Sequence, residues 1–160
     1  MSNQTKQLSN KHNQFLQNKE HLLNNLLNKE LQGLEINKYQ FSVENTMEKL
    51  GLDDDLIQEL IEEFVSQILE NKSLFLIYIE DLKKNKTLGK KLDYTNLRDL
   101  AHKNLGVAKN LRIYNAKVLL NELMTQDDLK YLSACLDALE ICVIKLNPEI
   151  ALSILEKEIE

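Results

Sequence analysis

The chain has 160 residues, of which four are glycine and one is proline. So few turn-forming residues disfavour a β-sandwich or barrel, which needs a turn signal about every 8–12 residues. Hydrophobic residues at 43% and charged residues at 28% are ordinary values for a globular chain and exclude disorder by composition. We therefore expect an all-α fold with one core.

Charge excludes further classes of protein. The formal net charge is −5, and lysines outnumber arginines eighteen to two. A nucleic-acid partner is not expected, because it would need a basic surface interleaved with aromatic residues. No uninterrupted apolar stretch approaches about 18 residues, and the N-terminus lacks the features of a signal peptide. We expect a cytoplasmic protein with no membrane insertion.

The two cysteines, Cys135 and Cys142, fall seven residues apart on one predicted helix. The helical rise separates them by about 10 Å along the axis, which is too far for a disulfide. They are expected to be reduced residues that fill the core.

Residues 1–40 indicate a helical extension rich in leucine, asparagine, glutamine and lysine, with Gly33 as a candidate terminator. Its narrow apolar stripe consists of Leu16, Leu23, Leu27, Leu31 and Leu34. Asparagine is a weak helix former, so this helix needs a partner surface. It could form a homodimer with a second copy or clamp onto its own chain, and a partly frayed tail is a third alternative.

From residue 41 onward the helix signals become regular. A short helix over 43–50 should end at Gly51, which suits a left-handed cap, and Asp53 should cap a long helix to about Lys84. The stretch from Lys83 to Lys91 carries five lysines. It is expected to be an exposed connection, either a solvated loop or a docking site for a partner.

Four more helices are expected in the rest of the chain. Two of them cover residues 94–111 and 113–124. Thr125 and Asp128 have the spacing of a capping box, which predicts a third helix ending near residue 146. Asn147 followed by Pro148 marks the start of the last, short helix.

Antiparallel helices joined by short connections favour an up-and-down four-helix bundle. The predicted fold class is therefore all-α, with three parts. They are an N-terminal helical extension over 1–40, a bundle over 41–147 and a short C-terminal helix over 148–160.

His102 is the candidate functional residue of the helix over 94–111. Successive residues advance by about 100° around a helix, which gathers apolar side chains on one face. These are Leu97, Leu100, Ala101, Val107, Ala108 and Leu111. His102 then lies about 140° from the centre of that face, so it is expected to be exposed.

Gly106 lies one turn beyond His102 on the same face, inside a predicted helix, where glycine costs about 1 kcal/mol relative to alanine. Its missing side chain would clear space for the active site of another protein, and Lys109 could place positive charge near a bound phosphoryl group. On spacing alone, ordinary exposed surface is the alternative. Metal binding is not expected, because no second histidine lies three or four residues away.

The stretch from Leu97 to Leu111 resembles the core motif of histidine-containing phosphotransfer (HPt) domains. That family has an Ala-His pair, a glycine four residues after the histidine, small residues beyond it and an Asn-Leu pair near the helix end. The matching positions are Ala101, His102, Gly106, Ala108, Asn110 and Leu111. Upstream, Gly51, the acidic residues after it and the segment 56–64 look like the family's first long helix. The resemblance covers about residues 41–147.

The resemblance implies a four-helix bundle in a two-component phosphorelay. His102 would accept a phosphoryl group from a receiver aspartate or a histidine kinase and pass it to the receiver domain of a response regulator. The chain would be a phosphocarrier rather than an enzyme, and it would need no cofactor, because the receiver holds the magnesium ion. The residues expected to support His102 are Arg98, Lys103, Gly106, Lys109 and Glu122.

Three positions depart from the family pattern. Asn104 and Leu105 replace an apolar residue and a lysine, and Asn104 points toward the core, where it needs a hydrogen-bond partner. Met124 takes the place of a carboxylate that often steadies the histidine ring, and Glu122 is the nearest substitute. The alternative function is therefore an HPt-like adaptor that binds a kinase or receiver through the same helix face without transferring phosphate.

Overall fold

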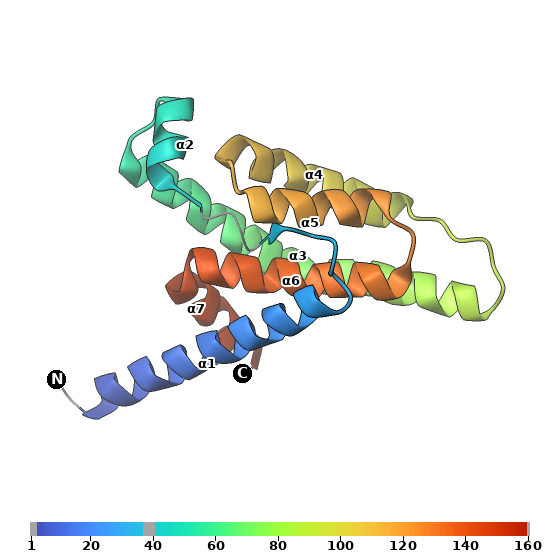
Figure 1. The fold of residues 1–160 in the computed structure, drawn as a ribbon, viewed down its shortest axis with the longest axis horizontal. Helices are drawn as coiled ribbons and strands as arrows, with labels where there is room; N and C mark the ends of the chain where they lie inside the picture. Colours follow the sequence, from blue (N-terminus) through green and yellow to red (C-terminus); the bar gives the residue numbers. More distant parts are fainter. Residues whose placement is uncertain (1–2, 37–40, 160) are drawn as a thin grey trace.

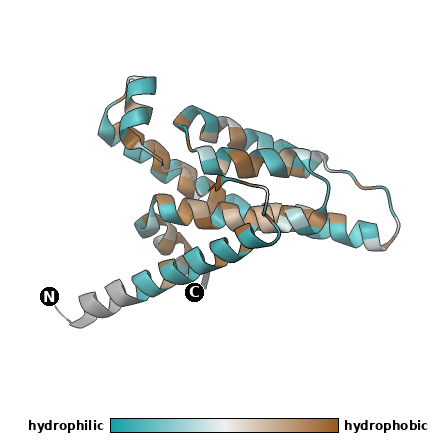
Figure 2. Ribbon diagram, viewed as in Figure 1, coloured by the Kyte–Doolittle hydropathy of each residue, from teal (hydrophilic) through white to brown (hydrophobic). Residues whose placement is uncertain are grey.

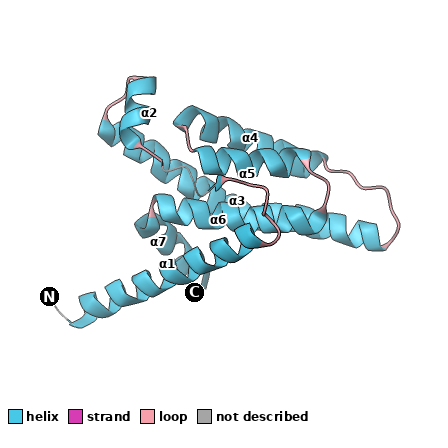
Figure 3. Ribbon diagram, viewed as in Figure 1, coloured by secondary structure: helices cyan, strands magenta, loops and turns pink. Residues whose placement is uncertain are grey.

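The computed structural model describes residues 3–36 and 41–159, with side chains over 11–36 and 41–156 (Figure 1). This part of the chain contains helices and loops and no strand (Figure 3), which confirms the all-α prediction. The helices are α1 Asn3–Asn28, α2 Val43–Leu50, α3 Asp54–Thr87, α4 Thr95–Leu111, α5 Tyr114–Thr125, α6 Leu129–Leu146 and α7 Pro148–Ile159. None of these helices, as far as the structure describes them, combines the length and apolar character needed to cross a membrane.

Several helix ends lie where local sequence signals predict them. Gly51 has φ 67° and donates its N–H to the carbonyl oxygen of Met47, which closes α2. The Asp53 side chain accepts the N–H of Leu56 and opens α3. The side chain of Asn147 accepts the N–H of Ile150 at the start of α7. Each cap satisfies backbone groups that a helix end leaves without an intrahelical partner.

Two predicted boundaries were wrong at helix C-termini. α3 continues beyond Lys84 to Thr87, because lysine is a good helix former and the left-handed residue that ends this helix is Gly89, with φ 70°. α1 ends at Asn28 rather than at Gly33. The residues after Asn28 form turns, in which the N–H of Leu31 donates to the carbonyl oxygen of Leu26 at 2.8 Å.

The predicted capping box after α5 was also wrong. Thr125 is the last residue of α5, and its hydroxyl donates to the carbonyl oxygen of Asn121. Asp128 itself is the N-cap of α6, where its side chain accepts the N–H of Tyr131 at 3.0 Å. Asp128, which was expected inside the first turn of α6, therefore lies just before that turn.

α3, α4, α5 and α6 pack around a shared core. α3 contacts α4 and α6, and α5 contacts the same two helices. α2 packs on α3, while α7 packs on α3 and α6. Large, fully buried side chains fill the interior, among them Phe64, Phe75, Ile79, Leu97, Leu119, Leu120 and Leu123. Cys135 and Cys142 are free thiols buried in the same core, and burial raises the pKa of each to about 12, so they are expected to be unreactive.

α1 lies across α6 of its own chain (Figure 1). Most of its surface is hydrophilic, whereas α6 is largely hydrophobic (Figure 2). Leu23, together with Leu31 and Ile36 just after the helix, is buried in the shared core. The intramolecular clamp is therefore the arrangement that the structure describes, and a homodimer through residues 1–40 stays a prediction.

A buried carboxylate marks the contact between α1 and α6. Glu140 of α6 is 6% exposed and pairs with Lys19 of α1 at 3.1 Å and with Lys72 of α3. Burial raises the pKa of Glu140, but the hydrogen bonds and positive charges of Lys72 and Lys19 outweigh burial and hold this pKa below its usual value. A second ion pair, between Glu20 and Lys145, joins the same two helices at 3.0 Å.

Candidate functional site

His102 lies in the middle of α4 and is exposed, as the helical periodicity predicts. The apolar face of α4 is turned to the core, where Leu97, Ala101 and Ala108 are almost completely buried. Because α4 is packed between α3 and α5, its core side chains fix which face remains in solvent. His102 is therefore presented on a helix that packs against α3 and α5, and not on a loop.

Arg98, one turn before His102, ties α4 to the loop between α5 and α6. Its guanidinium forms an ion pair with Asp127, and the guanidinium carbon lies 4.9 Å from the centre of the Tyr94 ring. The Tyr94 hydroxyl donates to the Asp127 carbonyl oxygen at 2.8 Å. Arg98 was predicted as a residue that supports the histidine, and in the structure its guanidinium is paired with Asp127. It can support His102 by holding this part of α4 in place.

Gly106 is exposed on the helix, one turn after His102. A Cβ atom built on Gly106 would have no neighbouring atom within 4 Å. Its φ is not in the left-handed region, which holds only Gly51 and Gly89 among the described glycines. Neither packing nor backbone conformation within this chain therefore requires glycine here, and the absence of a side chain leaves open space beside the histidine.

Two lysines of α4 are exposed near this open space. Lys103 follows His102 directly, and Lys109 lies two turns further along the helix. Both were predicted as supporting residues, and both are placed where a bound anion could reach them. A lysine ammonium acts on a phosphoryl group as a mobile point charge.

Asn104 and Leu105 face the interior instead of the solvent. Asn104 is fully buried, and its Nδ2 donates to the carbonyl oxygen of Leu100 at 2.9 Å. Its Oδ1 has no hydrogen-bond partner. The helical periodicity predicted that Asn104 would need a hydrogen-bond partner in the core. Its amide nitrogen has one, but its buried carbonyl oxygen does not, and such an oxygen lowers the stability of the fold.

Glu122 of α5 lies beside α6. It is close to Tyr131 and Cys135, and after burial its charge is among the causes that raise the pKa of both groups. Met124, on the same helix, packs partly buried against the core. Pairing of Glu122 with His102 stays a prediction, and the interactions that the structure does describe for Glu122 are with α6.

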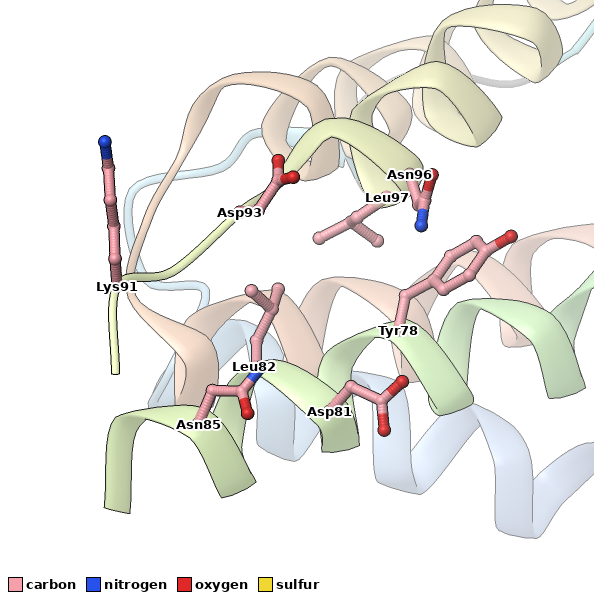
Figure 4. A pocket seen from close by; sticks show the side chains of 8 residues that line it. All are labelled: Tyr78, Asp81, Leu82, Asn85, Lys91, Asp93, Asn96 and Leu97. Atoms are coloured by element: carbon pink, nitrogen blue, oxygen red, sulfur yellow. The ribbon is translucent and has the colours of Figure 1, made fainter. Parts of the chain in front are cut away.

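A hollow of about 220 Å³ lies between the end of α3 and the start of α4 (Figure 4). Leu82 and Leu97 point toward each other across it, and Asp81, Asn85 and Asn96 contribute polar groups. His102 does not line this hollow. The histidine face and the hollow are therefore separate features of α4.

No group of three or more His, Cys, Asp or Glu side chains suited to a metal ion is found within residues 3–36 and 41–159. Comparison with protein-family models, curated proteins and solved structures finds no match to this chain. Inference about function therefore depends on the residues of α4 and their surroundings.

Proposed function

We propose that the chain is a histidine phosphotransfer protein, with α3, α4, α5 and α6 as an HPt-like four-helix bundle. His102 accepts a phosphoryl group from a receiver aspartate or a histidine kinase and passes it to the receiver domain of a response regulator. The observation that carries this proposal is an exposed histidine on a packed helix, one turn before a glycine that neither packing nor backbone conformation within the described chain requires.

A phosphocarrier of this kind needs an accessible nucleophile and little else. A neutral imidazole nitrogen has a lone pair that can attack phosphorus at neutral pH. The N–P bond forms as the P–O bond of the aspartyl phosphate breaks, and the bonding electrons leave with the aspartate carboxylate. The second ring nitrogen keeps its proton during this step. The receiver supplies the magnesium ion and the acidic pocket, so the carrier presents only a helix face that fits against them.

The open surface at Gly106 supports this mode of transfer. The receiver must bring its aspartate within bonding distance of the imidazole, which requires close approach of two protein surfaces. A side chain at position 106 would project into that approach path from one turn away. Lys103 and Lys109 add positive charge on a chain whose net charge is −5, and this charge favours the phosphorylated form of the partner.

The test is transfer from a phosphorylated receiver domain to the full chain. We expect a label on this protein that is labile in acid and stable in base, as a phosphoramidate is, and that is absent in His102→Gln. His21→Gln is the matched control, because His21 is also exposed on a helix but lies on α1. A label that survives in His102→Gln would contradict the assignment.

A non-transferring adaptor is the second candidate. It is favoured by the position of Glu122, whose described interactions are with Tyr131 and Cys135 rather than with the histidine. Such an adaptor would bind the receiver through the same face of α4 without becoming labelled. Binding of an unphosphorylated receiver, together with no label at any receiver concentration, would identify it.

A further inference from the structure

The end of α3 and the loop that follows it form a basic tip with an exposed leucine at its centre. We call the segment 84–91 the lysine tip; its exposed charged and large apolar residues are Lys84, Lys86, Leu88, Lys90 and Lys91. Leu88 is 57% exposed, more than any other large hydrophobic side chain that the structure describes. A single exposed apolar side chain is common on protein surfaces. What distinguishes Leu88 is its setting, because Lys86 and Lys90 lie two residues to either side of it.

The backbone of the lysine tip is ordered by its own hydrogen bonds. The N–H of Gly89 donates to the carbonyl oxygen of Lys86 at 3.1 Å, and the N–H of Lys90 donates to that of Asn85 at 2.9 Å. With Gly89 at φ 70°, this pattern is a Schellman cap. The usual apolar contact of that cap is absent here, because Asn85 and Lys90 occupy its two positions. The capping residues therefore do not cover the Leu88 side chain, which remains exposed to solvent.

The position of the lysine tip makes it accessible from outside. It lies at the far end of the molecule from α2, where α3 turns back to α4 (Figure 1). Lys91 lies at the edge of the adjacent hollow, and its side chain extends away from the other residues that line it (Figure 4). Within the described residues, Lys84, Lys86 and Lys90 form no ion pair, whereas Lys83 pairs with Glu80.

The acidic residues nearest to the tip in the sequence are Glu80, Asp81 and Asp93, and Glu80 is paired with Lys83. Asp93 accepts the N–H and hydroxyl of Thr95, and these bonds lower its pKa; the nearby charge of Lys91 contributes to the same shift. Asp81 lines the hollow behind the tip. The four lysines of the tip carry +4 and the whole chain carries a net charge of −5, so the other residues together carry −9. An anionic surface would attract the tip, repel the rest of the molecule and so orient it.

We propose that the lysine tip docks on the anionic lipid headgroups of a membrane surface, with Leu88 entering the boundary between headgroups and acyl chains. Lysines attract anionic lipid, while an apolar side chain between them gains from leaving water. A protein partner fits less well, because lysine is depleted in protein–protein interfaces and the tip offers one large exposed apolar side chain among its lysines. The contact is peripheral and does not depend on the proposed phosphotransfer.

The test is co-sedimentation of the full chain with lipid vesicles. We expect binding to phosphatidylcholine vesicles in which phosphatidylglycerol makes up about a third of the lipid, and none to phosphatidylcholine alone. Lys84→Gln/Lys90→Gln should weaken binding by about tenfold or more. Leu88→Asn should weaken it by about threefold to tenfold and leave its dependence on salt unchanged.

The matched control is Lys29→Gln/Lys49→Gln, which removes the same charge from two exposed lysines outside the tip. It should bind anionic vesicles as the unaltered chain does. Absence of binding at low salt, or an equal loss in this control, would overturn the proposal. So would tip variants that bind vesicles normally but slow transfer from a phosphorylated receiver, because the tip would then be a docking site for protein. Circular dichroism should show the same helix content in every variant, since all four lysines and Leu88 are exposed.

Discussion

Replacing Gly106 with alanine should make the protein more stable and a poorer phosphotransfer partner. The added Cβ meets no atom within 4 Å, and the backbone at this position is ordinary helix. Alanine exceeds glycine in helix propensity by about 1 kcal/mol, so the free energy of unfolding should rise by about 0.5–1 kcal/mol. For a chain of this size, that gain raises Tm by about 1–4 °C.

Transfer should change in the opposite direction. Gly106→Ala should slow phosphoryl transfer from a receiver domain, and Gly106→Gln should slow it more, because the longer side chain occupies the space beside His102. Phosphorylation of His102 by phosphoramidate should remain nearly normal in both variants, since a small donor needs no protein surface. This pair of donors separates a steric effect on the partner from damage to the histidine itself.

Asn18→Ala on α1 is the control for stability alone. Asn18 is exposed within a helix, so alanine there should raise the free energy of unfolding by about 0.5 kcal/mol without altering α4. Its transfer rate should equal that of the unaltered chain. Two results would contradict the role given to Gly106: a Gly106→Ala variant that is no more stable, or a Gly106→Gln variant that accepts phosphate from the receiver at the normal rate.

Three further predictions concern stability. Asn104→Leu removes a buried oxygen that lacks a partner, so urea unfolding should give a free energy about 1 kcal/mol higher; an unchanged value would show that Oδ1 is already satisfied. Glu140 has a lowered pKa, so its stabilising effect is complete above the unfolded value of about 4.5 and is lost as pH falls through the folded value. Urea unfolding of Glu140→Gln should therefore show a loss of about 1–3 kcal/mol at neutral pH and a smaller loss near pH 3, and an equal loss at both would contradict the ion-pair explanation. Leu31→Ala empties a buried site and should cost about 2–5 kcal/mol in urea unfolding with an unchanged sedimentation mass; a lower mass would instead show that α1 joins two copies.

Local sequence signals predicted most of the helices because caps act between neighbouring residues. Gly51, Asp53 and Asn147 each mark a helix end through a bond to a residue three or four positions away. The end of α3 was misplaced because a run of lysines indicates an exposed surface but does not interrupt a helix. Its end is set by the left-handed conformation of Gly89, which composition alone does not distinguish from an ordinary loop glycine.

Contacts between distant segments could not be predicted from spacing. Helical periodicity placed His102 in solvent and Asn104 in the core, because both positions follow from the face that α4 buries. The partners of Glu140 lie 121 and 68 residues away, so only the folded chain brings them together. The sequence did hold one signal for this contact, because Glu140 lies within an apolar run of α6. A carboxylate among buried residues needs a cationic partner, although the sequence does not say which one.

Engagement of Arg98 was missed for the same reason. Helical periodicity placed Arg98 near His102 but gave no information about Asp127, which belongs to the loop after the next helix, α5. A residue that lies beside a candidate nucleophile along one helix can therefore be committed to a different element. Lys103 and Lys109 remain the exposed cations of α4 that a bound phosphoryl group could use.

The most direct test of the central claim is to locate the phosphoryl group on the intact chain after reaction with a phosphorylated receiver. Peptide mapping by mass spectrometry under basic conditions, with phosphorus-31 resonance on the whole protein, reports both the residue and the type of bond. The account predicts one N–P bond, on His102, and its disappearance when unphosphorylated receiver is added back. A phosphoryl group on any other residue, or none while the receiver binds normally, would contradict it.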